Sequence, residues 1–414
     1  MGVRRVSALA LALSLMVSGC TADDSTGSTG TVTLPSPSAP PTLTPTTTST
    51  LQTGPPAAPD DLTTGPGVTD TSITAAVLLG ADPDAGLTDG IRLYQQSVNQ
   101  AGGICGRSLE FVTETGDPEA AYRRRASTVL GFLLPSTAGF DTVASASDQM
   151  PVLAVSGSSA ELTAQGPVVL GATDDVKAIN ALAYLVAKGK VPAHGTVGVL
   201  AGSDPGAVNG LAGARWWADR AGLTLDVRTS VSGTGWGDAS AVLALTDATT
   251  VNALLAATPP ELLVVTTMHG YDPASLPASA KDRLMLTVST PAFGSDHPAA
   301  AAVAKAFSES SSNRPGPRVL PGYALAAGWG RLLTKACADR TLTRAGLHTA
   351  MTTVGPAGVD SLFGPYDPAL VVTKQLPATL ISSMAMADPQ APAGLRPLVW
   401  TQTASGIDEY VPAR

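Results

Sequence analysis

Short apolar segments alternate with longer amphipathic ones through most of this chain, and this alternation constrains its fold more than any other feature. Ile73–Leu79 is a continuous apolar run typical of a buried strand, and Leu87–Val98 repeats apolar residues at helical spacing before a glycine stop at Gly102 and Gly103. The same alternation continues with expected strands at 109–112, 132–134 and 151–155 and expected helices at 118–129 and 138–149. Strands separated by helices predict parallel sheets.

A second series of the same kind follows. Its expected helices span 174–188, 207–221 and 239–257, and its expected strands span 196–200, 223–229, 261–267 and 284–288. Two series of this kind predict an α/β fold with two lobes, each a parallel sheet flanked by helices.

The composition excludes several classes of protein. The chain is 44% hydrophobic and 14% charged, with a formal net charge of -8. No block of basic residues is present, so we expect no nucleic-acid partner. After the N-terminal region there is no apolar run of about 20 residues that could span a bilayer.

The N-terminus has the layout of a secretory signal peptide, here residues 1–19. Arg4 and Arg5 precede an apolar run from Ala8 to Val17, which is too short to span a bilayer. The following Ser18-Gly19-Cys20 resembles the lipobox of bacterial lipoproteins, in which the cysteine is lipidated, for example with palmitate, after cleavage. This predicts a protein held on the outer face of the cell membrane by lipid at Cys20. An ordinary signal peptide with an incidental cysteine is the alternative.

A polar segment follows the cysteine. From Thr21 to about Gly67 the chain is nearly all Thr, Ser, Pro, Gly, Ala and Asp. Such a composition cannot bury enough apolar surface to offset the entropy of ordering, so residues 20–67 are expected to form a disordered tether.

Two cysteines remain besides Cys20. In an oxidising compartment we expect Cys105 and Cys337 to form a disulfide, which would close a loop that chain-entropy estimates credit with roughly 5 kcal/mol. Two buried free thiols are the alternative.

One stretch carries a resemblance to a known family. The run from Asn99 to Arg107 reads Asn-Gln-Ala-Gly-Gly-Ile-Cys-Gly-Arg, and Gly116-Asp117-Pro118-Glu119-Ala120 follows it after a strand. These motifs resemble those of the Leu/Ile/Val-binding-protein family, the type I periplasmic substrate-binding proteins of branched-chain amino acid ABC transporters. Weaker matches in the same order extend the resemblance from Val68 over the rest of the chain.

The resemblance implies two lobes joined by three crossings, with a ligand cleft between them that closes by hinge motion. On this basis lobe 1 is expected at 68–172 and 298–342, and lobe 2 at 173–297 and 343–414.

The cleft of such a fold lies beyond the carboxyl ends of the strands, where helix N-termini offer free N–H groups. In lobe 1 this position belongs to Ser136 and Thr137 after one expected strand, and to Ser158 and Ser159 after the next. The resemblance implies that these residues bind the carboxylate of a ligand. The alternative is that they are helix N-caps and nothing more.

In lobe 2 the resemblance implies that Tyr271 covers the ligand, with Met268 beside it, and that Asp204 lies in a cleft turn. A plain surface role for Tyr271 is the alternative. The acidic group with which amino acid binders of the family pair the ligand ammonium is missing, because Ser289-Thr290-Pro291 stands where it would follow the last strand. A branched-chain amino acid is therefore a doubtful ligand.

Catalytic patterns are weak. The four histidines are scattered, so no metal site is expected, and no motif for a nucleotide cofactor occurs. An exported hydrolase with Ser136 or Ser158 as nucleophile lacks a convincing base.

The sequence thus predicts a non-enzymatic, lipid-anchored solute-binding protein that needs no cofactor. It would capture a small polar solute, amino acid-like or an amide, and deliver it to an ABC permease in the membrane. The alternative keeps the fold but makes the chain a sensor or scaffold in the cell envelope whose cleft no longer serves transport.

Overall fold

The computed structural model describes residues 61–80, 85–231 and 235–413. The expected signal peptide, Cys20 and residues 20–60 of the expected tether lie outside the described residues. Within the rest of that expected tether, β1 (Thr63–Thr64) pairs in parallel with β12 (Thr341–Leu342). The Thr63 N–H donates to the Arg340 carbonyl at 3.0 Å and the Gly65 N–H to the Leu342 carbonyl at 3.0 Å. The folded body therefore begins before residue 68, its expected start.

The first of two larger sheets has five parallel strands in the order β3-β2-β4-β5-β6. Its strands are β2 (Ser72–Leu78), β3 (Ser108–Glu114), β4 (Phe132–Ser136), β5 (Val152–Ser156) and β6 (Val168–Val169). Each parallel pair needs a crossover, which explains why the expected helices lie between the strands.

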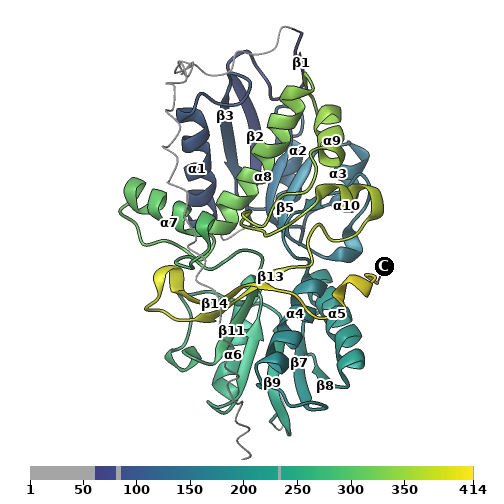
Figure 1. The fold of residues 1–414 in the computed structure, drawn as a ribbon, viewed down its shortest axis with the longest axis vertical. Coiled ribbons are helices and arrows are strands. Elements are labelled where there is room, and N and C mark those ends of the chain that lie inside the picture. Colours follow the sequence, from purple (N-terminus) through teal and green to yellow (C-terminus); the bar gives the residue numbers. More distant parts are fainter. Residues whose placement is uncertain (1–60, 81–84, 232–234, 414) are drawn as a thin grey trace, which may run out of the picture. The chain divides into compact units, whose positions relative to one another are not determined.

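The second sheet has seven strands in the order β14-β13-β11-β10-β9-β7-β8. The parallel strands are β7 (Thr196–Ala201), β8 (Thr224–Arg228), β9 (Ala239–Leu245), β10 (Leu263–Thr266) and β11 (Leu284–Val288). The late strand β13 (Ser382–Ala387) pairs antiparallel with β11, and β14 (Leu395–Gln402) pairs antiparallel with β13. Both late strands are yellow in Figure 1.

Ten α-helices connect and cover the strands of the described chain. They are α1 (Ala85–Gln100), α2 (Pro118–Arg125), α3 (Thr142–Ser147), α4 (Asp174–Ala187), α5 (Pro205–Ala221), α6 (Ala248–Ala257), α7 (Pro298–Ser310), α8 (Val319–Ala338), α9 (Arg344–Thr353) and α10 (Pro368–Lys374). Helices α1 and α8 lie side by side against the first sheet (Figure 1). No helix among the described residues combines the length and apolar character needed to cross a bilayer.

Both faces of the second sheet are buried, and alternate side chains of a strand lie in different hydrophobic cores. Leu243 of β9 lies in the core shared with α4 and α5, whereas its neighbour Val242 lies in the core shared with α6. Consecutive residues of a strand point to opposite faces, so a strand covered on both sides is apolar throughout. This explains why these strands read as continuous apolar runs.

The prediction of a helix at 239–257 is wrong for the first half of that range. Residues 239–245 form β9, paired with β7 and β10, and α6 begins only after Asp247, whose carboxylate accepts the Thr250 N–H at 3.0 Å. The Ala- and Leu-rich sequence favours a helix locally, but a central strand position buried on both faces overrides that propensity.

The expected boundary of the C-terminal segment also differs. Residues of α9 and α10, for example Leu347 and Val371, lie in the core of the first sheet, not of the second. The chain crosses to the second sheet only between α10 and β13, after residue 374, and not at 343 as expected. The reason is packing, since α9 contacts α8 and its apolar face is buried there.

The Asn99–Arg107 motif is a turn stabilised by its own side chains. Asn99 accepts the Leu109 N–H through Oδ1 at 2.7 Å and donates Nδ2 to the Leu109 carbonyl at 2.9 Å. Gly103 has a φ of +78°, and a Cβ there would lie 2.0 Å from the Arg107 carbonyl oxygen. Glycine is therefore required at this position.

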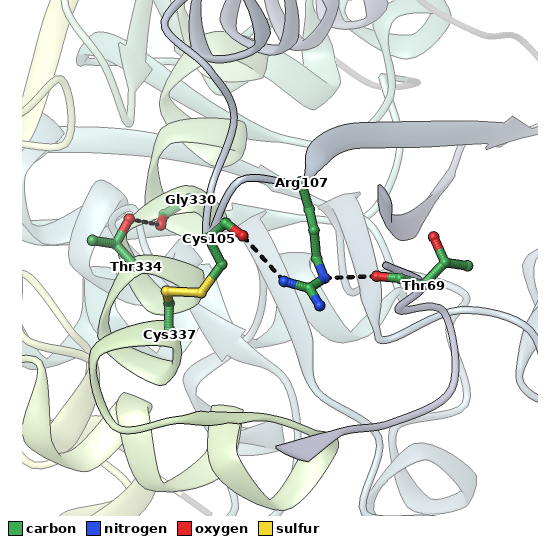
Figure 2. The surroundings of a disulfide bond; sticks show 6 residues. All are labelled: Thr69, Cys105, Arg107, Gly330, Thr334 and Cys337. Carbon is green, nitrogen blue, oxygen red and sulfur yellow. Dashed lines mark hydrogen bonds between the residues drawn. A yellow bond between two sulfur atoms is a disulfide. The ribbon is translucent and has the colours of Figure 1, made fainter. Parts of the chain in front are cut away.

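The expected disulfide between Cys105 and Cys337 is confirmed. It joins the turn after α1 to the last turn of α8, with a Cα–Cα distance of 6.0 Å across 232 positions of sequence (Figure 2). Beside it, Arg107 donates Nη1 to the Cys105 carbonyl at 3.1 Å and Nε to the Thr69 carbonyl at 2.6 Å. The bond thus ties the α1–α8 pair together at one end.

Candidate functional site

A cavity of about 270 Å³ lies where the carboxyl ends of strands from both sheets meet. The first sheet contributes Ser136 at the end of β4 and Ser156 at the end of β5, and the second contributes residues that follow β9, β10 and β11. The first turns of α1, α4, α5 and α8 complete the wall. This is the position at which parallel α/β sheets bind ligands.

The wall of this cavity is mostly apolar. Its apolar side chains are Leu87, Pro135, Ala138, Val155, Ala207, Leu245, Met268, Val288 and Pro321. Hydroxyls come from Ser136, Ser156, Thr246, Thr267, Thr287 and Ser289, and the ionisable side chains are Asp174, Lys177, Asp204, His269 and Arg318. An apolar wall with a few convergent polar groups is typical of a small-molecule site.

Three of the residues expected from the sequence line this cavity: Ser136, Asp204 and Met268. Asp204 is also the N-cap of α5, because its Oδ1 accepts the Ala207 N–H at 3.0 Å. Ser136 Oγ accepts the Ala138 N–H at 3.2 Å. Both side chains thus stabilise a local turn and present an oxygen at the cavity.

Thr137 and Ser158 are buried beside the cavity and are not among its lining residues. Thr137 Oγ1 donates to Glu161 Oε2 at 2.8 Å, and Ser158 Oγ accepts the Ala160 N–H at 3.2 Å. Ser158 is thus a helix N-cap, the alternative that the sequence left open, whereas Thr137 binds a side chain. Burial raises the pKa of Glu161, and the hydrogen bond from Thr137 opposes this shift.

Ser159 belongs to a buried polar network instead of the cavity. Its Oγ donates to the carboxylate of Asp175 and accepts Nδ2 of Asn209 at 2.9 Å. The Asn209 Oδ1 in turn accepts the N–H groups of Ser159 and Asp175, each at 3.1 Å. This network joins the segment after β5 to α4 and α5, where the chain passes from the first sheet to the second.

Tyr271 lies in the core of the second sheet and is 4% exposed. Its hydroxyl donates to the Gly394 carbonyl at 2.7 Å, and burial raises its pKa to about 12. Tyr271 therefore does not line the cavity and does not cover a ligand there, contrary to the expectation. The nearby Met268 does line the cavity.

The charged pair of Asp174 and Lys177 at the start of α4 was not predicted from the sequence. Lys177 is 4% exposed, and its Nζ lies 3.1 Å from Asp174 Oδ1. The signal was present in the sequence, because residues 178–187 of the same helix carry no charge at all. A pair three residues apart in such a helix shares one face, and here that face is the cavity wall.

The carboxyl of Asp174 is in an unfavourable environment for a negative charge. Burial raises its pKa, the ion pair with Lys177 opposes the shift, and the nearby carboxylates of Asp175 and Asp204 add to it. The cavity wall thus carries two carboxylates, those of Asp174 and Asp204, and two cationic side chains, those of Lys177 and Arg318. Within the described residues no group of three or more His, Cys, Asp or Glu side chains could hold a metal ion.

No protein-family model and no curated protein matches this sequence. Solved structures do match. A fatty acid ABC transporter substrate-binding protein from Thermomonospora curvata is 22% identical with a TM-score of 0.75, covering 86% of this chain and 99% of that one. A possible leucine/isoleucine/valine-binding protein from Rhodopirellula baltica SH 1 is 16% identical with a TM-score of 0.62, covering 80% and 97%.

A third similar structure is an ABC transporter solute-binding protein from R. palustris in complex with benzoate. It is 13% identical with a TM-score of 0.59, covering 80% of this chain and 97% of that one. The chain therefore has the two-lobed fold of type I substrate-binding proteins. The fold implied by the family resemblance is confirmed, and the similar structures include proteins of the kind that the sequence resembles.

Proposed function

We propose that this chain, with its type I substrate-binding fold, is a solute-binding protein of an ABC importer. The observation that carries the proposal is the cavity of about 270 Å³ at the carboxyl ends of the strands of both sheets. A solute there contacts both sheets at once, so it stabilises one relative arrangement of the lobes that a permease can recognise.

The solute is a small organic molecule with a polar end. The sequence predicts an amino acid-like compound or an amide, and the apolar walls extend this range to apolar acids. The similar structures include a fatty acid ABC transporter substrate-binding protein and a solute-binding protein in complex with benzoate, which supports the wider range.

The proposed location is the outer face of the cell membrane, with the chain anchored by lipid on Cys20. A tether beside the permease raises the effective concentration of loaded protein. Radiolabelled palmitate should be incorporated into the chain and not into a Cys20→Ala variant. Equal labelling of both would overturn the anchor.

Binding is tested by a thermal-shift screen of the purified chain against amino acids, amides and small carboxylic acids. A ligand present at 100 times its Kd stabilises the folded state by about 2.7 kcal/mol. Ala138→Trp places a bulky ring at the exposed edge of the cavity wall and should abolish the shift. Ala274→Trp, exposed in a loop that does not line the cavity, is the matched control.

Failure of every compound to bind would overturn the proposal. A solute that binds while its uptake by cells is independent of this chain would favour the sensor or scaffold function instead.

A further inference from the structure

The ammonium group of Lys177 has too few acceptors for its degree of burial. The residue is 4% exposed, and among the described residues its Nζ makes one hydrogen bond, to Asp174 Oδ1 at 3.1 Å. An ammonium carries three N–H donors. A buried charge whose hydrogen bonds are not made is costly, and Lys177 lines the cavity. A group that enters the cavity can supply the missing acceptors.

The other ionisable groups at the cavity are more fully used or more exposed. Arg318 donates Nη2 to the Met268 carbonyl at 2.9 Å and makes at least one further interaction within the chain. Asp204 is exposed and accepts the Ala207 N–H, and His269 is exposed beside it on the wall. Asp174 faces Lys177, with Asp175 and Asp204 as its acidic neighbours.

The remainder of the wall is suited to an uncharged apolar body. Leu87 and Pro321 come from the helices of the first sheet, and Leu245, Met268 and Val288 from the strand ends of the second. The cavity volume of about 270 Å³ gives room for a small organic acid.

An α-ammonium group would have to share the carboxylates of Asp174 and Asp204 with donors that they already accept. Asp174 Oδ1 already accepts a hydrogen bond from Lys177, and Asp204 Oδ1 accepts one from the Ala207 N–H. A second cation near Lys177 is also repelled by it.

We propose, resting on the solute-binding function above, that the solute is a small carboxylic acid with an uncharged apolar body and that Lys177 binds its carboxylate. The two carboxylate oxygens accept the N–H donors that Asp174 leaves unused, which gives short charge-assisted hydrogen bonds. Asp174 orients the lysine and competes with the ligand for it. The apolar body contacts the aliphatic wall.

Three compounds of the same shape test the proposal by calorimetry on the purified chain. 4-Methylpentanoate presents the carboxylate, 4-methylpentanamide is its neutral counterpart, and leucine adds an α-ammonium. The carboxylate should bind at least about tenfold more tightly than the amide, because a hydrogen bond to a charged group is lost in the amide. It should also bind more tightly than leucine.

Variants at the pair separate ligand recognition from folding. Lys177→Met should remove the preference for the carboxylate and leave the affinity for the amide unchanged, whereas Lys177→Arg should keep the preference. Asp174→Asn should tighten carboxylate binding, since the competing negative charge is gone, and a purely structural pair would not show this gain. Lys190→Met, on an exposed lysine beyond the same helix, is the charge-matched control.

Lys177→Met leaves the carboxylate of Asp174 without its cation and can fail to fold. The double variant Asp174→Asn/Lys177→Met removes both charges and keeps the test available. A carboxylate preference that survives in the double variant overturns the role of Lys177. Tighter binding of the amide or of leucine in the wild-type chain overturns the ligand class while the solute-binding function stands. Absence of binding by all three compounds overturns the ligand class, and only failure of the whole thermal-shift screen overturns the solute-binding function as well.

Discussion

Tyr410 donates its hydroxyl to the buried carboxylate of Asp175 at 2.8 Å, across 235 positions of sequence. Asp175 is fully buried and also accepts hydrogen bonds from Ser159 and from Thr173, the latter at 2.5 Å. One carboxylate is thus held by hydroxyls from the segment after β5, from the start of α4 and from the segment after β14. It stabilises the place where the chain first passes between the sheets.

Tyr410→Phe should lower the free energy of unfolding by about 1–3 kcal/mol, because the buried carboxylate loses a donor that nothing replaces. Burial and the adjacent Asp175 raise the pKa of the Tyr410 phenol, so it remains a donor at neutral pH. Urea unfolding measures the change. Tyr184→Phe is the control, since this tyrosine is also buried but its hydroxyl makes no hydrogen bond with another described residue. Equal effects of the two variants would contradict the prediction.

Gly90→Ala should destabilise the chain by about 3 kcal/mol through overpacking. A Cβ at Gly90 would lie 2.0 Å from the Val319 carbonyl oxygen and 2.7 Å from the Tyr323 nitrogen, so α1 and α8 would have to move apart. Gly358→Ala is the matched control, because no atom lies within 4 Å of its Cβ position. Thermal and urea unfolding of both variants check the difference, and a Gly90→Ala chain as stable as wild type would refute it.

Removal of the disulfide should cost about 3–5 kcal/mol, because the unfolded chain then regains the entropy of a long open loop. The measurement is urea unfolding of a Cys105→Ala/Cys337→Ala variant beside the wild type, with and without reductant. Reductant should lower the unfolding midpoint of the wild type and leave the variant unchanged. An effect of reductant on the variant would show that another reaction is responsible.

His348 should make the chain less stable in mildly acidic solution. Burial lowers the pKa of this imidazole from its ordinary value of 6.5, and the bond from its Nε2 to the Gln149 carbonyl at 3.0 Å opposes the shift. The unfolded chain therefore binds a proton first, and stability falls as the pH drops below about 6.5. Urea midpoints between about pH 7 and about pH 5 should fall less steeply for His348→Gln. Identical slopes would exclude His348 as the cause.

Local signals in the sequence sufficed for most of the elements. Asp117, Asp204 and Asp247 each cap a helix through a carboxylate that accepts a backbone N–H within a few residues. The Asn99–Arg107 turn likewise depends on groups within its own segment. Such interactions act over a few residues, so a pattern of residue types predicts them.

The errors arose where distant segments decide the structure. Residues 239–245 have the composition of a helix, yet their position between β7 and β10 makes them a strand. The late crossing after α10 depends on apolar contacts of α9 with α8. Neither the strand pairing of residues 239–245 nor the packing of α9 on α8 can be recognised from the residues of the segment itself.

In the candidate site, too, some residues could be predicted from the sequence and others could not. Ser136 could be placed at the cavity because it follows an apolar strand and the carboxyl ends of parallel strands share one edge, and Met268 because of the family resemblance. Tyr271, of similar position, turned inward to donate a hydrogen bond to Gly394, a partner 123 residues away. Strand order and sequence alone do not determine such rotamers.

The sequence by itself determined the α/β class, the two series of strands and the family resemblance, because periodicity and capping are properties of neighbouring residues. Only the tertiary structure decided which side chains line the cavity and which make contacts inside the protein. Asp174 and Asp175 show this best: adjacent in sequence, one lies beside Lys177 at the cavity wall and the other accepts Tyr410 in the core. Adjacent residues of a helix point about 100° apart, so the packing on each side gives them different roles.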